Sequence, residues 1–87
     1  MKLDPEDTAA AVRRLRRAHG QLGGVLRMLD EGADCEATVT QLAAVSKALD
    51  RAGFALITSG LQQCFTRDDD EATLDRARLE KLFLSLA

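Results

Sequence analysis

The chain contains two cysteines, Cys35 and Cys64, whose thiols could act together as a soft metal site or as a reactive pair. The segment between them has no Pro and is predicted to be one helix. Twenty-nine residues at ~1.5 Å each span about 43 Å, whereas a disulfide needs Cα atoms within ~7 Å. If the two thiols work together, they therefore come from different subunits. Twenty-nine residues is also close to eight turns, so an antiparallel pair of such helices would place each Cys35 beside the partner's Cys64.

Three helices are predicted around this pair. The first begins near Glu6, after an Asp-Pro start signal, and ends at Asp30 before a Gly-containing break. Asp34 is predicted to cap the second, which runs from Cys35 to about Phe65. A turn and acidic opening at residues 67–71 then lead into a short amphipathic third helix. The expected core stripes are Leu15, Leu22, Leu26 and Leu29 in the first helix and Val39, Leu42, Val45, Leu49, Ala52 and Leu56 in the second.

Size and composition favour a small all-α protein, with residues 1–87 forming a single domain. The 87 residues are 46% hydrophobic, lack Trp and Tyr, and contain one Pro. A core of this size is marginal alone, so we expect assembly into oligomers. No apolar run is long enough to cross a membrane, and the polar N-terminal residues do not resemble a signal peptide. We therefore expect a cytoplasmic protein without a membrane partner, whose cysteines are reactive or ligating.

Charge is unevenly distributed along the chain. The net charge is −2, yet residues 1–30 carry six Lys or Arg against four Asp or Glu, and four of the six lie between Arg13 and Arg17. An oligomer would repeat this basic stripe in every subunit even though its total net charge is negative. The net charge therefore does not exclude a nucleic-acid partner. In the same helix, Gly20, Gly23 and Gly24 are interpreted as sites of close helix approach, and His19 as a packing residue.

The segment from Arg14 to Met28, RLRRAHGQLGGVLRM, resembles the first-helix motif of the copper-sensing and nickel-sensing repressor family, the CsoR/RcnR type. Further blocks agree in order and spacing, namely Cys35, residues 42–45, residues 48–51 and Cys64. The resemblance covers roughly residues 6–82. It implies a three-helix protomer with a long central helix, an antiparallel four-helix dimer core, and assembly of dimers into a tetramer.

The resemblance also implies a function that is not enzymatic. Such proteins repress transcription by binding operator double-stranded DNA, and an effector bound between subunits releases the DNA. The residues expected to contact DNA are Arg13, Arg14, Arg17, Lys47 and Arg51. Because no aromatic residues interleave with these cations, we expect largely electrostatic, salt-dependent binding.

Members of the family differ in the residues at four positions that bind the effector. In this chain those positions are occupied by Lys2 or Leu3, Cys35, Gly60 and Cys64. Copper sensors would have His where Gly60 stands, and nickel sensors would have several His. Two Cys without His resemble the persulfide-sensing, CstR-like branch, in which the cysteines of neighbouring subunits are joined through sulfur. We therefore predict persulfide or polysulfide sensing by Cys35 and Cys64 with no cofactor.

The alternative is a Cu(I) sensor of the same family, in which Cys35 and Cys64 supply two thiolate metal ligands. Without the His, Glu80 is interpreted as a solvated charge. A thiol enzyme that carries sulfane sulfur is weaker, because no base or oxyanion donor is evident. A purely structural helical oligomer is weaker still, because it leaves the Arg cluster unexplained.

Overall fold

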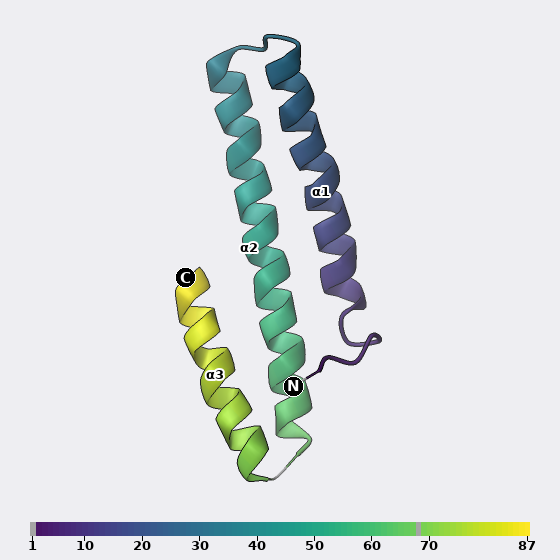
Figure 1. Cartoon of the computed structure of the whole chain (residues 1–87), viewed down its shortest axis with the longest axis vertical. Coiled ribbons are helices and arrows are strands. Elements are labelled where there is room, and N and C mark those ends of the chain that lie inside the picture. Colours follow the sequence, from purple (N-terminus) through teal and green to yellow (C-terminus); the bar gives the residue numbers. More distant parts are fainter. Residues whose placement is uncertain (1, 68) are drawn as a thin grey trace.

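The computed structural model describes residues 2–67 and 69–87, which form three helices and no strand. α1 spans Ala9–Asp30, α2 spans Cys35–Phe65 and α3 spans Asp70–Leu86. The helices run antiparallel to their chain neighbours, and α1 and α3 lie on opposite sides of α2 (Figure 1). The molecule is a flat, elongated layer of 55 × 24 × 12 Å. No helix in the described ranges is both long enough and apolar enough to span a membrane.

α1 begins at Ala9, three residues later than predicted, because the acidic segment before it folds as a separate turn. The Asp4 carboxylate accepts the N–H of Glu6 at 3.0 Å, and the Asp4 carbonyl accepts the N–H of Thr8 at 3.2 Å. The side chain of an Asp at a turn competes with helix geometry in this way. The acids therefore lie outside the first turn of α1.

The starts of the other two helices agree with the sequence pattern. The Asp34 side chain accepts the N–H of Ala37 at 3.0 Å, which caps α2 with Cys35 as its first residue. The Asp69 side chain accepts the N–H of Ala72 at 2.6 Å and caps α3. Gly32 adopts φ 71° between α1 and α2, a conformation that favours Gly. The predicted turn also includes Asp68, which lies outside the described residues.

Small side chains form the seam between α1 and α2. All the buried residues of α1 recur every seven positions, at Ala11, Ala18 and Val25. One series of buried residues in α2 has the same spacing, namely Thr38, Val45, Ala52 and Ser59, while Ile57, Gly60 and Cys64 are buried outside it. A seven-residue repeat keeps one narrow stripe of each helix against its neighbour. Mostly small residues on that stripe let the two backbones pack closely along the whole hairpin.

The predicted core stripes are mostly wrong for the single chain. Only Val45 and Ala52 of the predicted residues are buried, whereas Leu22, Leu26 and Leu49 are 41%, 58% and 47% exposed. The close seam leaves no room for branched Leu side chains, so they project from the hairpin. A Cβ atom at Gly20 would meet no packing neighbour within 4 Å, so the prediction of close helix approach there is not met within the chain.

The exposed leucines and the basic residues occupy opposite faces of the hairpin. At ~100° per residue, Leu22 lies about 40° to one side of Ala18, and Arg14 lies about 40° to the other side. In α2, Leu49 lies about 40° to one side of Val45, and Arg51 lies about 120° to the other side. Because α1 and α2 are antiparallel, rotations of the same sense from the seam lead to the same face of the pair. One face is therefore apolar and the other carries the cations.

α3 packs along the C-terminal half of α2. Leu79 shares a buried cluster with Ile57 and Cys64, next to the partly buried Leu61. Further along, the Phe54 and Phe83 rings lie 5.2 Å apart between centroids. Near the end of α3, Leu86 lies over Gly53, where a Cβ would come within 2.7 Å of a Leu86 methyl. α3 thus extends from Cys64 to within two residues of Arg51.

We predict that Ala18→Leu lowers the free energy of unfolding by about 1–3 kcal/mol, because a larger side chain overpacks the seam. Denaturant unfolding followed by circular dichroism measures this change. Ala43→Leu is the matched control, since Ala43 is exposed on α2. Equal stability of the two variants would contradict the assignment of the seam.

Candidate functional site

The two cysteines lie at opposite ends of α2 and in different environments. Cys35 is the first residue of the helix and is exposed, whereas Cys64 lies in its last turn and is 0% exposed. Their separation along an unbroken helix is about 43 Å at ~1.5 Å per residue. The structure therefore does not bring the predicted pair together within one chain. Among the described residues, no three His, Cys, Asp or Glu side chains gather as a metal-binding group.

A partly buried ion pair lies next to the turn that contains Cys64. Arg67 follows the end of α2, and its Nη2 donates to Oδ2 of Asp75 in α3 at 2.9 Å. Asp75 is only 4% exposed, and Arg78 lies on its other oxygen at 3.7 Å. The backbone N–H of Arg67 also donates to the Cys64 carbonyl at 3.2 Å. Arg67 thus joins the turn that ends at Cys64 to α3.

The hydrogen bond to Asp75 raises the pKa of Arg67, and the negative charges of Asp69 and of Cys64 as a thiolate add to this effect. The guanidinium therefore remains positive throughout the physiological pH range. The Arg67 guanidinium would therefore attract Cys64 in its thiolate form. Sequence reasoning missed this contact, although the opposite charges on either side of the break between α2 and α3 were a usable signal.

The other predicted effector positions contribute no soft donor. Gly60 is buried one turn before Cys64 and has no side chain. The amide of Gln63 donates to the Lys2 carbonyl at 3.4 Å, which places the N-terminal segment near the end of α2. His19 is exposed on α1 rather than packed within the chain, and Glu80 is exposed on α3. The sequence contains no thiols other than Cys35 and Cys64, so these two remain the candidate thiolate donors.

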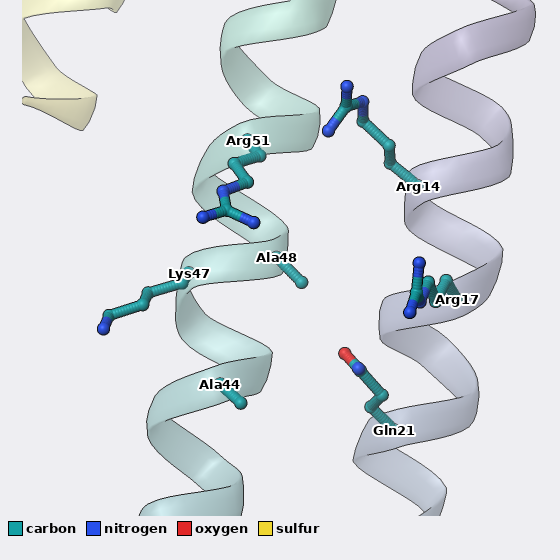
Figure 2. Close-up of a pocket in the computed structure, with 7 residues that line it drawn as sticks. All are labelled: Arg14, Arg17, Gln21, Ala44, Lys47, Ala48 and Arg51. Atoms are coloured by element: carbon teal, nitrogen blue, oxygen red, sulfur yellow. The ribbon is translucent and has the colours of Figure 1, made fainter.

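Most of the predicted DNA-contacting residues surround one groove between α1 and α2. Figure 2 shows its lining side chains, which come from two turns of each helix. The groove has a volume of about 300 Å³ and is lined by Arg14, Arg17, Gln21, Ala44, Lys47, Ala48 and Arg51. Arg13, the remaining predicted residue, is exposed on α1 but does not line the groove.

Four cations and no carboxylate line this groove, so its local potential is positive despite the net charge of −2. Guanidinium and ammonium groups at such spacing suit an anion that presents several oxygens, such as a phosphate backbone. Sequence reasoning missed Gln21, whose Oε1 is buried without a hydrogen-bond partner. Its spacing from Arg14 and Arg17, seven and four residues, was the signal that it shares their helix face.

Comparison with known proteins identifies the family of this chain. The metal-sensitive transcriptional repressor family profile matches residues 7–85. The copper-sensing transcriptional repressor CsoR of Mycobacterium ulcerans is 40% identical over 57 residues, which cover 66% of this chain and 49% of that protein. The copper-sensing repressor RicR of Mycobacterium tuberculosis is 40% identical over 55 residues, covering 63% of this chain and 57% of that protein. CsoR of the same species is 37% identical over 57 residues, covering 66% and 48%.

These relatives correct one prediction. All three are named as copper-sensing, which contradicts the prediction that the Cys35 and Cys64 site works without a cofactor. None of their names supports the persulfide-sensing branch, and the family is one of transcriptional repressors rather than enzymes. The chain spans about half the length of these relatives. With the family profile matched along nearly its whole length, the chain belongs to the metal-sensitive transcriptional repressor family.

Proposed function

We propose that this protein is a DNA-binding transcriptional repressor that responds to Cu(I). The observation that carries the DNA-binding proposal is the groove of Arg14, Arg17, Lys47 and Arg51, in which four predicted cations from two helices come together. The family supports the repressor role, and the names of the relatives support copper as the effector.

Assembly is part of the proposal, because the apolar face of the hairpin needs a partner. Its exposed residues include Val12, Leu15, Leu22, Leu26 and Leu29 in α1 and Val39, Leu42 and Leu49 in α2. Burying this face against a second copy gives an antiparallel four-helix dimer, and dimers then pair into a tetramer. Because the cations lie on the opposite face, the dimer keeps its grooves open to DNA.

The same dimer supplies the donors for copper. Two thiolates are soft ligands that suit Cu(I), and Cys35 of one subunit can meet Cys64 only in another subunit. The residues present therefore fit a copper site made of two sulfur ligands, without the third donor that a side chain at Gly60 would provide. Cu(I) bound there would link the subunits through their sulfur atoms.

The surroundings of Cys64 offer a route from copper to DNA. Cys64 is buried against Leu79, and Arg67 ties the same turn to Asp75, so a ligand on its sulfur must disturb the contacts of α3. The far end of α3 contacts α2 through Leu86 and Gly53, close to Arg51. A shift of α3 therefore reaches the helix turn that carries a groove cation.

Persulfide or polysulfide sensing is a second candidate function, and one observation favours it. The only soft side chains at the predicted effector positions are the two thiols, with Gly60 in place of a nitrogen donor. A disulfide or short sulfur chain between Cys35 and Cys64 of neighbouring subunits would use both of them.

The two effectors can be separated by fluorescence anisotropy on DNA from upstream of the protein's own gene. Cu(I) is expected to release the wild-type protein, and Cys35→Ser and Cys64→Ser are each expected to remain bound. Ser46→Ala, at an exposed position of α2, is the control and should be released normally. Release by an organic polysulfide but not by Cu(I) would favour the second candidate. Release of both Cys variants by Cu(I) would contradict the proposed ligands.

Arg51→Ala tests the groove as the DNA contact. Each phosphate contact that is lost should reduce the slope of log K against log salt concentration by about 0.9, so the slope should fall by this amount per engaged groove. Titrations at several salt concentrations measure it. Lys81→Ala, on the exposed face of α3, removes the same charge and should leave the slope unchanged. Equal slopes for the two variants would place the DNA elsewhere.

Leu49→Glu tests the apolar face. A carboxylate on the face that a second copy buries should convert the assembly to monomers or unfold it, because a buried unpaired charge is strongly unfavourable. Light scattering after gel filtration measures the mass. Gln62→Glu adds the same charge at an exposed position and should leave the mass unchanged. A Leu49→Glu protein of wild-type mass would exclude this face as the interface.

A further inference from the structure

The groove holds three uncharged residues that phosphate binding does not explain. Gln21, Ala44 and Ala48 line it together with the four cations. Figure 2 shows the Gln21 side chain directed from α1 toward α2, and the Ala44 and Ala48 methyl groups directed back toward α1. The small Ala side chains leave space beside the Gln21 amide, which lies at the Ala44 end of the groove, next to Arg17 (Figure 2).

The Gln21 amide oxygen accepts no hydrogen bond within the described part of the chain. Its Oε1 is buried and has no partner among the described residues. A phosphate group presents acceptor oxygens and therefore does not pair with Oε1. Nucleobase edges differ, because adenine presents an amino donor beside a ring nitrogen acceptor in the major groove. A Gln amide matches that pair with its own acceptor and donor.

The neighbouring alanines match the other half of the same base pair. Thymine carries a methyl group in the major groove, and apolar contact with Ala is a common way of recognising it. Ala44 and Ala48 present methyl groups one helical turn apart on α2, opposite Gln21. The uncharged lining thus has the composition needed to read an adenine–thymine pair, while the cations further along the groove suit neighbouring phosphates.

We propose that Gln21, with Ala44 and Ala48, reads an adenine–thymine base pair in the major groove of the DNA. The inference rests on the proposed DNA-binding function and assigns its source of sequence preference. The Gln21 amide oxygen is buried in the free protein, but the side chain as a whole is only half-buried. Rotation about its side-chain torsions would turn the amide outward, where it can accept from adenine N6 and donate to adenine N7. Arg14, Arg17, Lys47 and Arg51 hold the backbone and set the salt dependence.

The test uses a duplex recovered by the full-length wild-type protein from a random-sequence pool. Each A·T pair of that duplex is replaced in turn by G·C, and dissociation constants are measured by anisotropy. The wild type should lose about tenfold in affinity at one or more of these positions, and Gln21→Ala should bind all of these duplexes alike. The salt slope of Gln21→Ala should equal that of the wild type, because no phosphate contact is removed.

A second variant separates base reading from a structural role. Gln21→Glu keeps the side-chain shape but only accepts hydrogen bonds, so its preference at the same position should change from adenine to cytosine. Gln62→Ala, exposed on α2, should retain the wild-type preference. Circular dichroism confirms that each variant is folded.

The outcomes distinguish this inference from the function on which it rests. If the wild type and Gln21→Ala show the same A·T preference, or Gln21→Ala weakens binding to every duplex equally, Gln21 does not read the base. If the wild type binds with a steep salt slope but recovers no preferred sequence, base reading is overturned while DNA binding stands. If the wild type binds no duplex, or binds duplexes with an affinity that does not depend on salt, both proposals are overturned.

Discussion

The close contact of small residues between α1 and α2 determines the arrangement of everything else in this protein. Ala18, Ala52 and the buried residues spaced seven positions from them bring the two helices together. They also set the rotation of each helix about its own axis. That rotation places the leucines on one face of the hairpin and the groove-lining cations on the other. The proposed assembly and the proposed DNA binding therefore depend on the same packing.

A second set of contacts joins the end of α2 to α3. Cys64 lies among these contacts, packed against Leu79 and close to the ion pair between Arg67 and Asp75. Removing Arg67 would leave the buried Asp75 carboxylate with only the more distant Arg78 at 3.7 Å, which is unfavourable. The position of α3 is consequently sensitive to events at Cys64. Cys35, exposed at the far end of α2, has no such surroundings in its own chain.

The helices themselves could be predicted from sequence because local signals specify them. Asp34 caps α2, no Pro interrupts residues 35–66, and the acidic residues before α3 mark its start. The start of α1 was misplaced because Asp4 forms a turn of its own, a competition that a capping pattern does not reveal. The core was misassigned because hydrophobic spacing marks every apolar surface that becomes buried. Hydrophobic spacing does not distinguish apolar residues that are buried within the chain from apolar residues that remain exposed for contact with a partner.

The candidate site was predictable to a similar degree. Resemblance to a family identified Arg14, Lys47 and Arg51, and the basic run of the first helix identified Arg17. Their convergence follows from the register of the hairpin. Gln21 was missed because an unsatisfied amide becomes visible only when its neighbours are in place. The absence of a cofactor was wrongly predicted, since the missing His was given more weight than the softness of the two remaining thiols.

Copper stoichiometry in mixed assemblies tests most directly whether one copper site is built from two chains. Cys35→Ser and Cys64→Ser proteins are denatured, mixed and refolded together, and bound Cu(I) is measured in competition with a chelator. A mixed dimer contains one intact pair, Cys64 of one subunit and Cys35 of the other. A site shared between subunits predicts that the mixture regains tight copper binding that neither variant shows alone. Tight binding by either variant alone, or no recovery in a folded mixture, would contradict it.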